Sequence, residues 1–240
     1  MSGIRSRRRR GLLLAFVAGV GALVVASPVL ADDFSQGNGA NAAANWKAYV
    51  RTASGYTLTT TVASSSTAGI SFDFQPMPDP SVPQGSTSFF ATTHPGDLLG
   101  DLTGKTLTAT FTISETDPAF TYYGYGQSWN EGTTPASVRL YFHGNTTGTF
   151  DPADYWWSNP ASATLASLVG NTVTLTVSLD GTNWSDYYGK LGTAVPDQFA
   201  ASVADVTMIG LSFGGGSFFS NGVGLSSGSA TFTLSSFSAR

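Results

Sequence analysis

The stretch VTMIGLSFGGGSFFSNGVGLSSGSATFTLSSF, residues 206–237, decides the fold of this chain. In its first part, large apolar side chains occupy every second position, at Ile209, Leu211 and Phe213. Side chains of a strand point alternately to the two faces of a sheet, so this spacing predicts a strand with one buried face. A glycine- and serine-rich loop follows, and the alternation returns at residues 230–234. The stretch therefore predicts two strands joined by a long loop.

Two further features of this stretch bear on structure and function. Phe237 falls out of phase with the closing strand, which predicts a bulge or a change of face. The glycine run 214–216 is not followed by a helix or a lysine, so it does not match a phosphate-binding loop. Because the loop has few side chains that do chemistry, we expect it at most to border a binding site.

Strand-like alternation recurs through the chain, in residues 46–51, 56–62, 70–74, 88–91, 107–113, 138–142 and 173–179. Residues 76–85 hold four prolines, which predicts a loop that crosses a sheet edge. Two short helices are predicted, at 160–169 with Asn159 as cap and at 197–204 with Asp197 as cap. The chain is thus predicted to be all-β, a two-sheet antiparallel jelly-roll-like β-sandwich with one or two short helices.

The N-terminus resembles a secretory signal peptide over residues 1–31, with cleavage after Ala31. Five arginines precede an apolar run, residues 12–26, that is shorter than the ~20 residues a membrane anchor needs. The arginines loosely fit a twin-arginine export signal, although a generic basic segment explains them equally. Residues 32–45 are small and polar and predict a flexible lead-in, followed by one domain over 46–240.

Amino-acid composition limits the compartments and the classes of partner that fit this chain. The chain has no cysteine, which for an exported protein favours a bacterial source. Beyond residue 31 it carries six basic and fifteen acidic residues, a net charge of −9. Such a balance disfavours nucleic acid and anionic membrane as partners and predicts a secreted, soluble mature form.

Two stretches together resemble the laminin B domain, also called laminin domain IV, and more broadly the galactose-binding-like jelly roll. They are FFATTHPGDLLGDLTGKTLTATFTI at 89–113 and VTLTVSLDGTNW at 173–184, the latter followed by VTMIGLSF. The resemblance covers residues 88–237. It implies a jelly-roll sandwich in an extracellular protein, with binding or spacing roles rather than catalysis. Laminin domains of this type lie between cysteine-rich repeats, which this chain lacks.

Aromatic side chains are the main indication of a ligand site. They gather at 122–129, at 155–157 and, after the Asp180-Gly181 turn, at 184–188, and one strand carries a polar face at 139–143. Exposed rings stack on sugars, and nearby polar groups bond the hydroxyls. The alternative is that the rings cover the ends of the sandwich. The residues expected to bind an extracellular glycan are Tyr122, Tyr123, Tyr125, Trp129, Arg139, Tyr141, His143, Trp156, Trp157 and Trp184.

Catalysis and metal binding have weaker support in the sequence. The sequence has only two glutamates, Glu115 after a predicted strand and Glu131 in a predicted turn. A glycosidase would need this pair as its general acid and its base or nucleophile. Structural calcium is an alternative role for four aspartates that otherwise cap turns. These are Asp97, Asp101, Asp151 and Asp154. No other cofactor is expected. A non-catalytic carbohydrate-binding module is the first functional hypothesis, ahead of a glycan-cleaving enzyme and a structural matrix protein without a small ligand.

Overall fold

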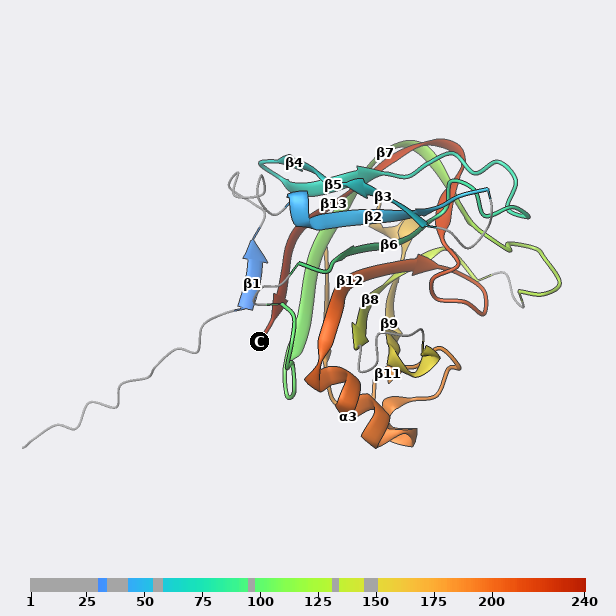
Figure 1. Cartoon of the computed structure of the whole chain (residues 1–240). Helices are drawn as coiled ribbons and strands as arrows, with labels where there is room; N and C mark the ends of the chain where they lie inside the picture. Colours follow the sequence, from blue (N-terminus) through green and yellow to red (C-terminus); the bar gives the residue numbers. More distant parts are fainter. Residues whose placement is uncertain (1–29, 34–42, 54–57, 95–97, 131–133, 145–150) are drawn as a thin grey trace, which may run out of the picture.

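The computed structural model describes residues 30–33, 43–53, 58–94, 98–130, 134–144 and 151–240, in which strands dominate (Figure 1). The strands are β1 (Leu30–Asp33), β2 (Trp46–Arg51), β3 (Leu58–Val62), β4 (Ser64–Ser66), β5 (Gly69–Asp73), β6 (Thr87–Thr92), β7 (Thr106–Tyr122), β8 (Ser137–Gly144), β9 (Tyr155–Thr164), β10 (Val173–Ser178), β11 (Trp184–Ser185), β12 (Val206–Gly214) and β13 (Val223–Ala239). The helices are the 3-10 turns η2 (Pro152–Asp154) and η3 (Gly192–Ala194) and the α-helices α2 (Leu165–Leu168) and α3 (Pro196–Ala204). None of the helices in these residues is long and apolar enough to cross a membrane.

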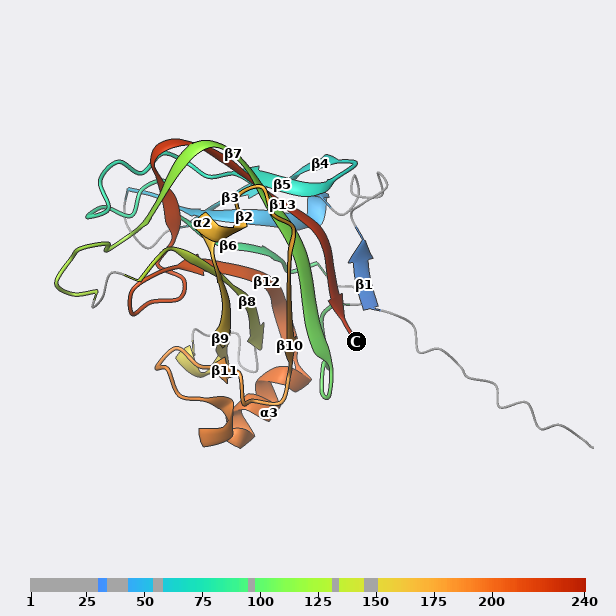
Figure 2. The ribbon, with the colours of Figure 1, turned by 180° about the vertical axis from the view of Figure 1, so that it is seen from behind.

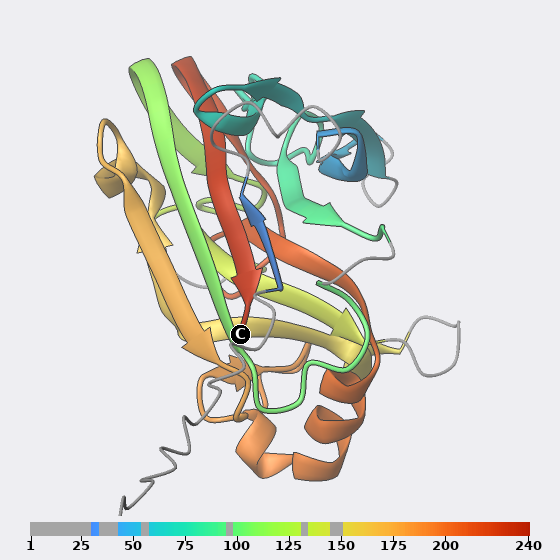
Figure 3. The ribbon, with the colours of Figure 1, turned by 90° about the vertical axis from the view of Figure 1, so that its left-hand side faces the viewer.

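One layer of the sandwich is built on the two longest strands. β13 pairs antiparallel with β7 along nearly its whole length, and β10 pairs with the other edge of β7. β5 and β1 pair with β13 on its free side, and β4 extends the layer beyond β5. Figure 3 shows β10, β7 and β13 side by side in orange, green and red.

The second layer has the strand order β3-β2-β6-β12-β8-β9-β11, again antiparallel throughout. Seen from behind, β7 and β10 of the first layer lie in front of β8 and β9 (Figure 2). Val223 joins the layers, because it pairs with Tyr122 of β7 and with Thr87 of β6. The predicted all-β sandwich with antiparallel strands is confirmed, and hydrogen bonding through β13 is continuous between its two layers.

Large apolar rings fill the space between the layers. Phe72 of β5 contacts Phe90 of the second layer at 5.0 Å between ring centroids and Phe232 of β13 at 5.6 Å. Phe213, from the stretch that decides the fold, contacts Phe232 at 5.3 Å. These rings come from both layers and are all buried, so the alternating apolar positions of the sequence do form the core.

The predicted details mostly hold. The β13–β7 register shifts between Leu234 and Ser236, and Phe237 is buried, which confirms the predicted bulge. α3 confirms the second helix, but its N-terminal cap is Val195 and not Asp197. The prediction of a helix over residues 160–169 was wrong for most of that range. Residues 160–164 belong to β9, and Asn159 donates its backbone N–H to Asn183 instead of capping a helix.

Candidate functional site: an aromatic groove

A groove of about 650 Å³ opens beside the second layer, and we call it the aromatic groove. Five segments far apart in the sequence form it: the end of β2, the turns after β7, strand β9, the loop after β11 and the loop between β12 and β13. Its lining residues are Arg51, Tyr123, Trp129, Trp157, Tyr187, Tyr188, Gly189, Ser217, Phe218, Phe219, Ser220 and Asn221.

Several of these rings face solvent. Trp129 is 47% exposed, and Phe218 is 42% exposed. Tyr187 and Tyr188 are 52% and 67% exposed. Exposed apolar side chains that gather in one hollow with a polar rim commonly mark a ligand-binding site. The groove is therefore the strongest candidate site among the described residues.

Trp129 owes its position to a glycine. Gly124 has φ +92°, a backbone conformation that side chains disfavour, and a Cβ there would run into the indole ring of Trp129. The indole therefore lies directly over the Gly124 backbone. Its ring centroid is 5.0 Å from that of Tyr123 and 6.0 Å from that of Phe218. These three rings form one wall of the groove.

The glycine-rich loop, residues 215–222, is held by two buried asparagines. Asn130 Oδ1 accepts the N–H of Ser217 at 2.8 Å, and Asn221 Oδ1 accepts that of Gly215 at 2.9 Å. Gly215 itself packs on Tyr122, whose ring occupies the space a Cβ would need. Residues 217–221 line the groove, whereas the sequence led us to expect that this loop would at most border a site.

Asp186 organises the loop that carries the two exposed tyrosines. Its buried carboxylate accepts the N–H groups of Tyr188 at 2.9 Å and Lys190 at 2.8 Å. Its backbone also exchanges hydrogen bonds with Lys190 and Gly189. An aspartate that accepts backbone N–H groups two and four residues ahead fixes a tight turn. The turn then projects Tyr187 and Tyr188 into solvent.

Two arginines lie in or next to the groove. Arg51 donates from Nε to Ser88 Oγ at 2.9 Å and from Nη2 to the carbonyl of Ser220 at 3.0 Å. Arg139 lies under the groove, with its guanidinium carbon 4.6 Å from the centre of the Phe219 ring. Burial lowers the pKa of Arg139 to about 10, so it stays protonated at neutral pH.

The residues predicted for the polar face of β8 do share one face, the outer face of the second layer. Tyr141 stacks there against Phe89 at 4.6 Å and Trp157 at 5.6 Å, and His143 stacks on Tyr155 at 4.2 Å. Burial raises the pKa of Tyr141 well above its usual value and lowers that of His143. Tyr141 is fully buried, so its ring packs against the lining residue Trp157 and does not itself reach a ligand.

The structure divides the ten predicted ligand residues into three groups. Three of them line the groove: Tyr123, Trp129 and Trp157. The Trp157 indole is largely buried and donates from Nε1 to Ser212 Oγ at 3.1 Å. Tyr125, Arg139 and His143 are at least partly exposed but outside its lining. The remaining four are buried, which corrects the expectation that they are exposed. They are Tyr122, Tyr141, Trp156 and Trp184.

Burial of Trp156 follows from its position on a strand. Trp156 and Trp157 are neighbours on β9 and point to opposite faces, so only Trp156 enters the core. Trp157 would face solvent, but Phe219 of the β12–β13 loop packs at 6.0 Å from its ring. Phe218, Phe219 and Arg51 were missed as site residues. The adjacent phenylalanines in a glycine- and serine-rich loop were the available signal, since such a pair cannot both be buried by one strand.

The glutamates predicted for catalysis are not brought into this groove. Glu115 lies inside β7 opposite Ala230, where it is exposed, and not after the end of a strand as predicted. It lines neither the aromatic groove nor the two other cavities described for the chain. Glu131 lies outside the described residues.

The aspartates predicted for calcium act mainly as turn caps. Asp101 and Asp151 each accept the backbone N–H of the residue two positions ahead, both at 2.9 Å. A hydrogen bond from the side chain of Thr103 lowers the pKa of Asp101. Asp154 is buried with Oδ2 unbonded, and desolvation raises its pKa. Asp97 lies outside the described residues, which contain no group of three metal-binding side chains. Calcium stays a prediction.

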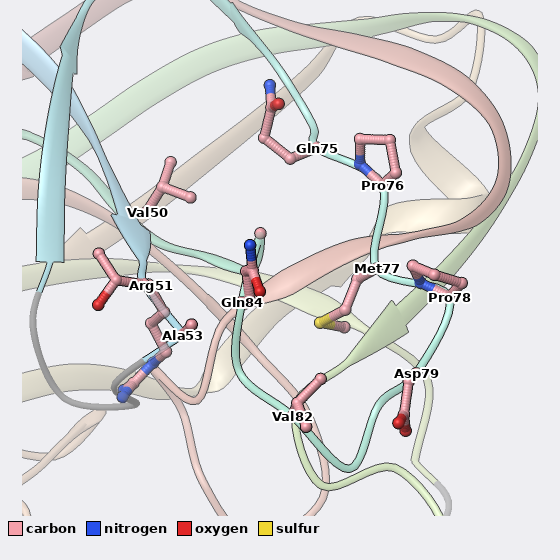
Figure 4. Close-up of a pocket in the computed structure, with 12 residues that line it drawn as sticks. Val50, Arg51, Ala53, Gln75, Pro76, Met77, Pro78, Asp79, Val82 and Gln84 are labelled. Atoms are coloured by element: carbon pink, nitrogen blue, oxygen red, sulfur yellow. The ribbon is translucent and has the colours of Figure 1, made fainter.

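A second cavity, of about 570 Å³, lies where the proline-rich loop 76–85 folds against the end of β2 (Figure 4). Figure 4 shows Met77, Pro78 and Val82 on one side and Val50 and Ala53 on the other. It has no aromatic ring in its lining, and its carboxylate, Asp79, is engaged by the N–H and hydroxyl of Ser81 at 2.9 and 2.6 Å. Its chemistry is poorer than that of the aromatic groove.

Comparison with known proteins adds little to this geometry. No family model and no curated protein matches the chain. Among solved structures, the chain is similar to a xylan-binding module, CBM15, with a TM-score of 0.40 and 15% sequence identity. The match covers 87% of this chain and 97% of that one. A similarity this low carries no argument about fold or ligand.

Proposed function

We propose that this protein is a non-catalytic carbohydrate-binding module and that the aromatic groove is its binding site. The observation that carries the proposal is the convergence of four exposed rings on one hollow, those of Trp129, Tyr187, Tyr188 and Phe218. Three separate loops supply these rings, and each loop is anchored by Gly124, Asp186 or the pair of buried asparagines. Such preorganisation keeps the entropic cost of ordering side chains on binding low.

The chemistry of the groove suits a sugar. Flat aromatic faces pack against the C–H-rich faces of pyranose rings, which removes apolar surface from water at both partners. The guanidinium of Arg51 and the phenol groups of the lining tyrosines provide donors and acceptors for hydroxyls. Four exposed rings spread over several loops favour an extended chain of sugars over a single monosaccharide.

The enzymatic alternative has no comparable support among the described residues. Glycoside hydrolysis by the common mechanism needs two carboxyl groups roughly 5–10 Å apart across the cleft. No carboxylate appears among the residues that line the aromatic groove. We therefore propose binding without cleavage. Export of the module and an extracellular site of action, both expected from the N-terminal segment and from the laminin B resemblance, form part of this proposal.

A glycan array with the purified protein tests the proposal, followed by affinity electrophoresis with the glycan bound best. We expect Trp129→Ala and Tyr188→Ala each to weaken retention by roughly tenfold or more, the loss of about 1.4 kcal/mol. Tyr125→Ala is the matched control, since Tyr125 is a 44% exposed ring of the same loop but does not line the groove. Equal losses in all three variants, or no bound glycan on the array, would count against the groove as the site.

A further inference from the structure

Positive charge is concentrated at the aromatic groove of an otherwise acidic molecule. Beyond residue 31 the sequence has six basic residues, and three of them belong to this region. Arg51 lines the groove, Arg139 lies against the underside of Phe219, and Lys190 follows the exposed tyrosines. With a net charge of −9 over the same part of the sequence, an even distribution of charge would make such a surface negative.

Each of the three cations lies beside a residue that lines the groove, namely Ser220, Tyr188 or Phe219. Arg51 is fixed by its hydrogen bond to Ser220, a lining residue. Lys190 is exposed, and its Nζ lies 6.0 Å from the ring centre of Tyr188. Arg139 donates from Nη1 to Ser137 Oγ at 2.8 Å, while its buried Nε has no hydrogen-bond partner.

Within the described part of the chain, no acidic side chain lines the groove beside these cations. None of the twelve lining residues is an aspartate or glutamate, and within the described part of the chain neither Arg139 nor Lys190 forms an ion pair. Among the described residues of the lining loops the acid is Asp186, and it is buried with its carboxylate on two backbone N–H groups. A partly buried cation without a counter-ion is costly unless something else compensates it.

We infer that the aromatic groove selects an anionic glycan, one with uronate or sulfate groups, over neutral sugar chains. The inference rests on the proposed function and adds the charge of the ligand to it. Arg51 and Lys190 lie at the groove to meet the anionic groups while the rings stack on the sugar faces. Arg139 adds positive potential from below, through a medium of lower dielectric than water. Arg139 stays protonated at neutral pH, because burial lowers its pKa only to about 10.

The test compares each charged glycan with its own neutral form. Polygalacturonate is paired with carboxyl-reduced polygalacturonate, and carrageenan with desulfated carrageenan, in affinity electrophoresis at low and high salt. We expect at least one native polymer to bind roughly tenfold more tightly than its neutral form, and the preference to shrink as salt screens the charges. The polymer pair that shows the preference identifies carboxylate or sulfate as the group recognised.

A pair of charge-reversal variants tests the location. Lys190→Glu and Lys105→Glu change the net charge equally, but Lys105 precedes β7 while the groove residue Tyr123 follows its other end. We expect Lys190→Glu to weaken binding of the native polymer by roughly fivefold to tenfold, and Lys105→Glu to leave it unchanged. Equal effects of the two variants overturn the assignment to the groove.

The remaining outcomes separate the two proposals. Binding of neutral polymers that depends on Trp129 but shows no preference for the charged forms overturns the anionic ligand and leaves carbohydrate binding standing. Retention of no polymer, charged or neutral, together with an empty glycan array, overturns both. Thermal unfolding of each variant, measured beside the wild type, reveals any variant whose loss of binding reflects loss of folding.

Discussion

Gly124 and Trp129 depend on each other, five positions apart in one loop. The absence of a side chain at Gly124 leaves the space in which the indole lies, and the positive φ turns the chain so that Trp129 folds back over it. Many glycines in this chain serve ordinary turns, but this one also positions a ring of the proposed site. For these two residues, the groove thus depends on the absence of a Cβ at Gly124 as well as on the indole of Trp129.

Replacement of Gly124 by alanine should therefore impair binding. The new Cβ displaces the indole of Trp129, and the positive φ adds strain, so the free energy of unfolding should fall by about 1–3 kcal/mol and glycan retention should drop. Gly126→Ala is the control, because Gly126 also has a positive φ, +72°, but open space around its Cα. It should lose stability through strain and keep retention. Equal retention in the two variants would show that the position of Trp129 does not matter.

Among the elements, the loops form most of the site, and buried polar side chains hold these loops in place. The loop between β12 and β13 reads as flexible in the sequence, yet two buried amide side chains hold it. Asn130 accepts the N–H of Ser217, 87 positions away, and Asn221, within the loop, accepts that of Gly215. The short loop after β11 is held locally by Asp186. Buried polar groups with all partners in place make a loop rigid, because breaking any one bond leaves a desolvated group unpaired.

Removal of the Asp186 carboxylate should loosen the loop that carries Tyr187 and Tyr188. We expect Asp186→Ala to lower the free energy of unfolding by about 1–3 kcal/mol, since two backbone N–H groups lose their acceptor, and to weaken glycan retention without removing a lining residue. Chemical unfolding and affinity electrophoresis measure the two effects.

Asp180→Ala serves as the comparison for this variant. Asp180 also caps a turn, through the N–H and hydroxyl of Thr182 at 3.0 and 2.6 Å, but it is exposed and lines no groove. It should affect retention little. If Asp186→Ala lowers stability and leaves retention at the wild-type level, the order of this loop is irrelevant to binding.

At the scale of the whole molecule, the first described strand overlaps the predicted cleavage site. β1 pairs with the end of β13, with Leu30 opposite Ala239 and Asp33 opposite Ser236. Cleavage after Ala31 leaves Asp32 and Asp33, which pair with Phe237 and Ser236. The remaining strands of the layer do not involve residues 1–31, so the sandwich should tolerate the loss of this segment.

We expect the exported protein to begin at Asp32. Expression of the full chain in a bacterial host, with N-terminal sequencing and mass measurement of the released protein, checks this. The released form should also melt cooperatively, because its core lies within the later strands. A released protein that still contains residues 1–31 would contradict the cleavage, and a cytoplasmic product that is never exported would contradict the signal.

The sequence alone determined the class of fold, most strand positions and even the bulge before Phe237, because these depend on local alternation of apolar side chains. It also indicated the segments rich in rings. Only the tertiary structure decided which rings reach solvent. Tyr141 and Trp184 are buried while Tyr188 is exposed, although all three look alike in sequence. The physical reason is that exposure depends on what packs above a side chain. In the stretch 206–237, the glycine-rich loop brings Phe219 over Trp157 of β9 and Phe218 beside Trp129, both far earlier in the chain.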